Sequence, residues 1–130
     1  MEVIYEAPSC KAVYKAEKKR IHFEFNGYMN FEQATDMYKT VAEFMKSNQV
    51  QSFFNDLREL KGTFTKLTTW LFENMAGVVS LGLKYDALVL NNDVFSQFAA
   101  EDFAKKITVL DFQIFHSMSD AEQWLLEREQ

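Results

Sequence analysis

The first 30 residues of the chain alternate between apolar and polar positions in a way that predicts strands. Ile21, Phe23 and Phe25 share one side of an extended segment while polar residues occupy the other, which is typical of a half-buried strand. Short apolar stretches at 3–7 and 11–16 predict two strands before it. We therefore expect the chain to open with antiparallel strands.

After residue 30 the pattern changes to helices that alternate with strands. An apolar stripe at three- and four-residue spacing runs from Ala34 to Met45. It follows Asn30 and Gln33, which fit a capping box. Further helices are predicted at 65–80, 94–105 and 119–128, and further strands at 50–57, 86–91 and 108–114.

The strand predicted at 86–91 differs from the opening strands because its apolar run, Ala87 to Leu90, is unbroken. Such a run is expected when helices cover both faces of a parallel strand. Alternating helices and strands also require crossover connections in one sheet. The sequence therefore predicts an α/β fold, with a mixed sheet of antiparallel N-terminal and parallel C-terminal strands and helices on both faces. We expect residues 1–130 to form a single domain.

The last predicted helix has its own start signal and apolar face. Ser119 and Glu122 have the spacing of a second capping box. Ala121, Trp124 and Leu125 lie on one side of the helix, so we expect Trp124 to be buried against the sheet.

Charge argues against one class of partner. The formal net charge is −5 and the isoelectric point is near 5.0, which repels a phosphate backbone. We therefore expect no nucleic-acid partner. One basic cluster, formed by Lys15, Lys18, Lys19 and Arg20, falls at a predicted hairpin tip, and we expect it to be solvated there.

Cysteine content and hydropathy bear on the cellular compartment. Cys10 is the single cysteine, so an internal disulfide is impossible. No apolar run approaches the roughly 18 residues of a membrane span, and the first residues do not resemble a signal peptide. These features predict a cytoplasmic protein without a membrane span.

The sequence contains no recognisable catalytic or metal-binding motif. Neither His22 nor His116 has a neighbouring His, Cys or carboxylate at metal-ligand spacing. GxSxG, HExxH and glycine-rich phosphate loops are absent from the sequence. We expect no enzymatic activity, no metal and no cofactor.

Three segments together resemble a known family: FNDLREL before a Trp-bearing helix, GLKYDALVLNNDVF, and IFHSMSDAEQWL. Across nearly the whole chain the pattern resembles the STAS domain in its SpoIIAA-like branch, particularly the single-domain versions found in Bacteroidetes. The resemblance implies a non-catalytic regulatory or ligand-binding module, with a protein partner or a small ligand.

The sequence departs from this family at its regulatory serine. The resemblance implies an aspartate followed by a phosphorylated serine at the start of the helix after a central strand. Asp56 stands at the corresponding place, yet Leu57 and Arg58 follow it. Thr63 and Thr65 are the nearby hydroxyls before that helix.

The charges in FFNDLREL, residues 53–60, have two interpretations. In the first, Asp56 accepts backbone N–H groups of the following turn or pairs with Arg58. In the second, the charged and hydroxyl residues form an anion or partner site at the end of the strand and the start of the next helix. The residues of this candidate site are Asp56, Arg58, Lys61, Thr63 and Thr65.

An alternative function follows from a second likeness. SpoIIAA-like domains resemble a small version of the CRAL-TRIO lipid-binding fold, which implies a pocket for a small apolar ligand. Aromatic residues at helical spacing are more often part of a core than of a ligand site. The candidates are Phe64, Trp70, Phe72, Phe95, Phe98 and Phe103.

Overall fold

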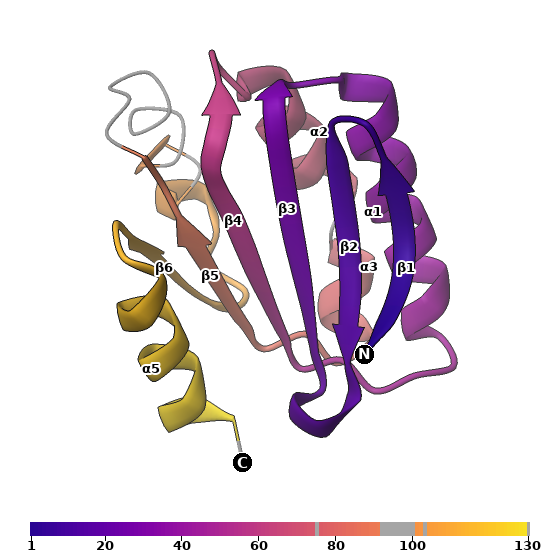
Figure 1. The fold of residues 1–130 in the computed structure, drawn as a ribbon. Coiled ribbons are helices and arrows are strands. Elements are labelled where there is room, and N and C mark those ends of the chain that lie inside the picture. Colours follow the sequence, from indigo (N-terminus) through magenta and orange to yellow (C-terminus); the bar gives the residue numbers. More distant parts are fainter. Residues whose placement is uncertain (75, 92–100, 103, 130) are drawn as a thin grey trace.

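The computed structural model contains a six-stranded mixed sheet with helices on both faces (Figure 1). It describes residues 1–74, 76–91, 101–102 and 104–129. The strands are β1 (Glu2–Ala7), β2 (Cys10–Lys15), β3 (Arg20–Tyr28), β4 (Ser52–Lys61), β5 (Tyr85–Val89) and β6 (Asp111–Phe115). The helices whose two ends lie among the described residues are η1 (Ala16–Lys18, 3-10), α1 (Phe31–Met45), α2 (Thr65–Asn74), α3 (Ala76–Ser80) and α5 (Met118–Arg128).

The strands follow one another across the sheet in chain order, from β1 to β6. β1, β2 and β3 pair antiparallel, whereas β3 to β6 pair parallel. The predicted mixed α/β fold is therefore confirmed, including the parallel arrangement of the strands expected near 50–57, 86–91 and 108–114. β5 is paired on both sides, as its unbroken apolar run indicates.

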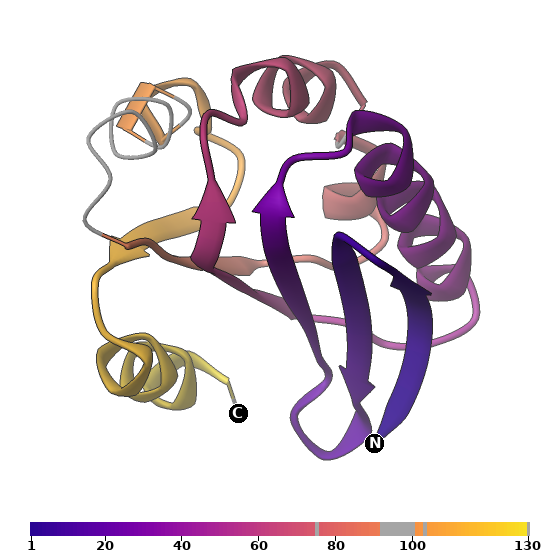
Figure 2. The ribbon, with the colours of Figure 1, turned by 45° about the horizontal axis from the view of Figure 1, so that its top comes forward.

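Alternation along the strands separates two apolar layers. Phe23, Phe53 and Leu88 belong to the larger layer, which lies beneath α1, α2 and α3. Phe54 and Val89 belong to the smaller layer, which α5 covers over β4 to β6. Figure 2 shows α5 on the opposite side of the sheet from α1 and α2.

The predicted start of α1 is half confirmed. Asn30 is the N-cap, and its Oδ1 accepts a hydrogen bond from the Gln33 N–H at 3.0 Å. The Gln33 side chain does not return to Asn30, because its Oε1 accepts from the backbone N–H and the hydroxyl of Ser9 instead. Gln33 thus attaches the start of α1 to the β1–β2 turn.

The predicted capping box of α5 is wrong. Ser117 is the N-cap, with its Oγ accepting from the Asp120 N–H at 3.3 Å, and Ser119 lies inside the helix. Glu122 does not bond back to the helix start, because its carboxylate contacts Arg20 and Lys18 on the sheet. Trp124 packs against the smaller apolar layer as expected, but it is only partly buried there.

Other element boundaries are refined by the structure. The helix predicted at 65–80 corresponds to α2 and α3, between which Met75 lies outside the described residues. Most of the helix predicted at 94–105 also lies outside them, although 101–102 and 104–106 are helical. Of the helices that the structure describes, none has the length and hydropathy needed to cross a membrane.

Candidate functional site

An apolar pocket lies between the sheet and α2. Its walls come from β3 to β6, α1, α2, α3 and the segment before β6, and it encloses about 60 Å³. A cavity of about 150 Å³ accommodates benzene, so this one holds a smaller group as it stands. The lining residues are Phe25, Met29, Tyr38, Phe53, Asn55, Leu57, Phe64, Leu67, Thr68, Leu71, Val78, Leu83, Asp86, Leu88, Ile107, Leu110 and Phe112.

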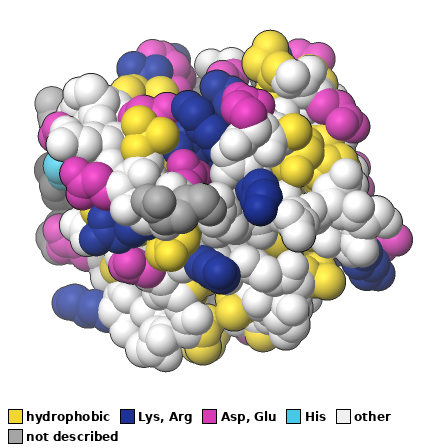
Figure 3. All heavy atoms as spheres, turned by 90° about the horizontal axis from the view of Figure 1, so that it is seen from below, with side chains coloured by type: hydrophobic (Ala, Val, Ile, Leu, Met, Phe, Trp, Pro, Cys, Tyr) yellow, Lys and Arg dark blue, Asp and Glu magenta, His cyan; other side chains and the backbone are white. Residues whose placement is uncertain are grey.

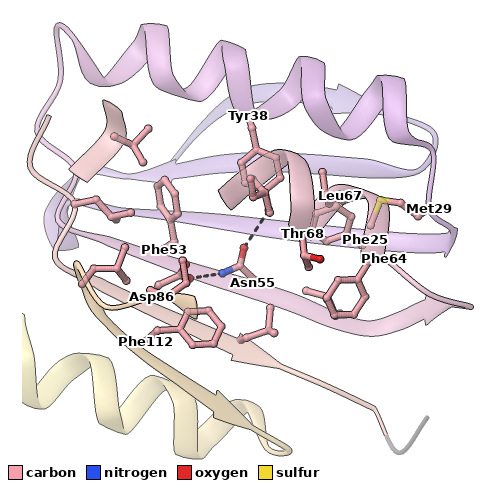
Figure 4. A pocket seen from close by; sticks show the side chains of 17 residues that line it. Phe25, Met29, Tyr38, Phe53, Asn55, Phe64, Leu67, Thr68, Asp86 and Phe112 are labelled. Carbon is pink, nitrogen blue, oxygen red and sulfur yellow. Dashed lines mark hydrogen bonds between the residues drawn. The ribbon is translucent and has the colours of Figure 1, made fainter. Parts of the chain in front are cut away.

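Three polar side chains meet in this apolar pocket (Figure 4). The Asn55 amide nitrogen donates to Asp86 Oδ1 at 2.5 Å and to the Ala87 carbonyl at 3.0 Å. The Tyr38 hydroxyl donates to Asn55 Oδ1 at 3.4 Å. Asn55 is therefore occupied on both its nitrogen and its oxygen, and it connects α1 to β5.

Strand register explains why the Asp86 carboxyl is desolvated. Asp86 on β5 lies directly beside Phe53 of β4 and Phe112 of β6. Its side chain therefore stands between two phenyl-bearing positions on the pocket side of the sheet (Figure 4). Burial raises the pKa of Asp86 to about 7, while the hydrogen bond from Asn55 opposes this rise.

Tyr38 complements this carboxyl as a neutral donor. Burial, followed by the neighbouring charge of Asp86, raises the pKa of Tyr38 well above its ordinary value. The hydroxyl therefore stays protonated at neutral pH and donates to Asn55. Of Tyr38, Asn55 and Asp86, the carboxyl of Asp86 is the group that titrates near pH 7.

The predicted site residues Asp56 and Arg58 lie at a bulge in β4. From Glu24 to Asn26, β3 advances by two residues. Over the same stretch β4 advances by three, from Asp56 to Glu59, so β4 carries one extra residue there. Asp56 Oδ1 accepts from the Arg58 N–H at 3.1 Å, and the Arg58 guanidinium donates to both Asp56 oxygens at 2.9 Å.

These contacts agree with the first interpretation of FFNDLREL, with one difference. Asp56 both accepts a backbone N–H and pairs with Arg58, but it does so within the strand. β4 continues to Lys61 because the bulge returns Leu60 to the core side, so the predicted strand end at residue 57 is wrong. Burial raises the pKa of Asp56, but hydrogen bonds from Arg58 outweigh this effect and lower the pKa overall.

The remaining predicted site residues lie close to the start of α2. Lys61 is exposed at the end of β4. Thr63 and Thr65 are also exposed, with their hydroxyl oxygens 2.8 Å apart, and Thr63 Oγ1 accepts from the Thr65 N–H at 3.3 Å. The structure thus places all five predicted residues between the β4 bulge and the first residue of α2.

The aromatic residues proposed to line an apolar pocket divide into three groups. Phe64 lines the pocket. Trp70 is partly buried against the core, and Phe72 is 53% exposed. Phe95, Phe98 and Phe103 lie outside the described residues.

Sequence reasoning missed Tyr38, Asn55 and Asp86 as a group. A signal was present, because Asn55 interrupts the apolar run of β4 and Asp86 precedes the apolar run of β5. Both sit on strands whose neighbouring positions are buried, where a polar residue needs a partner. Pairing the two strands in register brings these interruptions together.

Arg20 lies on the opposite face of the sheet and contradicts the expectation of a solvated tip. Its side chain is 0% exposed, and its guanidinium donates to both oxygens of Glu129 and to Glu122. Burial lowers the pKa of Arg20, but these hydrogen bonds outweigh this effect and raise the pKa overall. Ser52 also donates to Glu129. Arg20 therefore binds α5 to the sheet instead of facing water.

The rest of the basic cluster lies nearer to the surface. Lys18 pairs with Glu122 at 2.9 Å, and Lys19 is exposed. Figure 3 views the molecule from the end that carries the η1 turn, and Lys and Arg side chains are intermixed there with Asp and Glu. This face has no extended area of positive charge in the view shown.

His22 is beside Arg20 and is neutral at physiological pH. Its ring stacks on Phe54 with centroids 4.7 Å apart, and its Nε2 lies 3.4 Å from an Arg20 nitrogen. Burial, then the nearby charges of Lys15 and Arg20, lower the pKa of His22 to about 4. Among the described residues, no group of three or more His, Cys, Asp or Glu is placed to hold a metal ion.

Comparison with known proteins identifies the fold. Neither a protein-family model nor a curated protein matches the sequence. Among solved structures, the chain is similar to an uncharacterized protein of the DUF3478 family with a SpoIIAA-like fold from Shewanella loihica PV-4. The TM-score is 0.65 at 16% identity, covering 93% of this chain and 97% of that chain. This chain has a SpoIIAA-like fold. At this identity the likeness concerns architecture alone, and it confirms the fold that the sequence resemblance implied.

Proposed function

We propose that this chain is a non-catalytic binding module that holds a small, largely apolar ligand in the pocket between α2 and the sheet. The observation that supports this most directly is the composition of the pocket, in which apolar walls surround one polar group at Asp86 and Asn55. Ligand sites are typically concave and apolar, with a few convergent polar groups that orient the ligand.

The size of the pocket favours a small ligand over a lipid. About 60 Å³ is below the volume that benzene occupies in an engineered cavity, whereas a lipid chain needs much more. The lipid alternative therefore requires α2 to move away from the sheet. A small ligand requires only local side-chain adjustment.

We propose in addition that Asp56, Arg58, Lys61, Thr63 and Thr65 contact a protein partner. Lys61, Thr63 and Thr65 lie just before or at the start of α2. Leu67 and Leu71 of the same helix line the pocket. Occupancy of the pocket and the position of α2 are therefore linked through one element. A partner that contacts the start of α2 is placed to respond to the ligand.

Native mass spectrometry of freshly purified protein tests the ligand proposal, together with an NMR titration with ethanol as a small neutral probe. We expect a retained small molecule, or saturable shifts at pocket residues, in the wild type. Leu71→Trp fills the pocket from α2 and should abolish both. Phe72→Trp is the matched control because Phe72 is 53% exposed on the same helix. Protein that is purified empty and shows no saturable shift would contradict the proposal.

A further inference from the structure

Asp86 differs from the other described residues of the pocket because it carries an ionisable carboxyl without a cationic partner. Its hydrogen-bond donor is the neutral amide of Asn55. None of the described lining residues is Lys, Arg or His, and no ion pair of the described part of the chain includes Asp86. Within the described part of the chain, the pocket therefore contains no opposite charge for this carboxyl.

The absence of a cation beside Asp86 indicates what kind of ligand would pair with it. A carboxylate in an apolar site is costly unless a cation pairs with it, and charge-assisted hydrogen bonds are the strong ones. A ligand carboxylate would place a second negative charge beside Asp86 and would be repelled. A protonated amine supplies both the charge and the N–H donors that Asp86 lacks.

The walls next to Asp86 suit the rest of such a ligand. Phe53 and Phe112 stand beside it on the neighbouring strands (Figure 4). Aromatic rings attract ammonium groups and also pack against alkyl groups. The net charge of −5 further favours the approach of a cation over that of an anion.

The volume limits the size of the apolar part. About 60 Å³ accommodates a few carbon atoms, so a short alkyl chain fits better than a fused ring system. We propose that the pocket binds small primary amines, with the ammonium group on the carboxylate of Asp86 and a short alkyl group among the apolar side chains. This proposal rests on the proposed ligand-binding function and specifies its ligand class.

The proposal predicts a pH dependence that belongs to Asp86. Of the groups that surround it, Asn55 on β4 and Phe112 on β6 do not titrate, and Tyr38 on α1 stays protonated. Amine binding requires an ionised Asp86 and a protonated ligand. Affinity for an alkylamine should therefore rise between about pH 5 and pH 8, while affinity for a neutral alcohol should remain constant.

NMR titrations with ethylamine, ethanol and acetate, which are similarly small and differ in charge, test this inference. At pH 8 we expect ethylamine to bind wild-type protein at least about tenfold more tightly than ethanol, and acetate to bind most weakly. Asp86→Asn keeps an acceptor for Asn55 and should remove the preference for the amine over the alcohol. Asp120→Asn makes the same change of charge at an exposed position of α5 and should behave like the wild type.

The outcomes separate this inference from the proposed function. Saturable ethanol binding without a preference for the amine, or an amine preference that survives in Asp86→Asn, would overturn the amine assignment alone. Absence of saturable shifts at pocket residues with all three probes would overturn the pocket as well. The spectrum of each variant also reports whether it is folded.

Discussion

The two faces of the sheet each hold an ionisable side chain among apolar neighbours, and the two side chains differ in their partners. On the α5 face, Arg20 is 0% exposed and is paired by two glutamates. On the pocket face, Asp86 has one neutral donor and an adjacent cavity. Arg20 is electrostatically complete, whereas Asp86 is not.

This difference separates a structural role from a binding role. A buried ion pair whose hydrogen bonds are all made leaves no capacity for another molecule. A carboxyl that faces a cavity with a free acceptor has such capacity. An ionisable group among apolar neighbours would not by itself distinguish the two sites, but the number and charge of its partners do.

The largest effect is expected from removing the Arg20 charge. Arg20→Met leaves Glu129, whose side chain is 5% exposed, without its cation. We expect a loss of about 3 to 5 kcal/mol in the free energy of unfolding, as for other broken buried pairs. Urea denaturation at pH 7 measures it, with Lys19→Met as an exposed neighbouring control. A loss below about 1 kcal/mol would mean that the pairing of Arg20 with the glutamates does not stabilise the fold.

An opposite and smaller effect is expected from Asp86→Asn. The folded-state pKa of about 7 exceeds the ordinary value of 3.8, so the folded protein holds the proton more tightly. Wild-type stability should therefore decline as pH rises from about 4 to 7 and stay low above it. The variant lacks this decline and should be more stable by on the order of 1 to 3 kcal/mol at pH 8.

Urea denaturation between pH 4 and 8 measures this difference, which should shrink towards pH 4. Asp120→Asn serves as the exposed control and should differ little from the wild type at every pH. If wild-type protein proved more stable than Asp86→Asn at pH 8, Asp86 would be a satisfied structural residue like Arg20.

The smallest effects are expected at the Asp56–Arg58 pair in the β4 bulge. Asp56→Ala leaves the Arg58 N–H without its acceptor and should cost about 1 to 2 kcal/mol. Replacing Arg58 and Lys61 together by Ala should cost about 0 to 1 kcal/mol, because Arg58 is 49% exposed. The double variant should nevertheless weaken binding of any partner identified at the start of α2. Thermal unfolding compares the variants, and equal losses with partner binding intact would assign the pair a structural role only.

Sequence patterns predicted the elements because the patterns depend on local burial. The alternation of Ile21, Phe23 and Phe25 and the unbroken run of β5 reflect how many faces of each strand are covered. The β4 bulge was not predictable in this way, because one extra residue shifts the alternation without changing the composition. Arg20 was misassigned because its partner Glu129 is 109 residues away.

The candidate site was less predictable than the fold. Asp56 and Arg58 attracted attention as charges within an apolar strand, yet they largely satisfy each other. Asn55 and Asp86 became neighbours only once β4 and β5 were placed in register. Sequence spacing identifies contacts within one element, whereas this group depends on pairing between elements.

The distance of 109 residues between Arg20 and Glu129 also has a consequence for biosynthesis. At typical ribosomal rates of about 5 to 20 residues per second, Glu129 is made roughly 5 to 20 seconds after Arg20. Until then, the guanidinium must remain hydrated, and the sheet face that α5 covers stays open. The nascent chain therefore passes through a period in which this face is available to chaperones or to other chains.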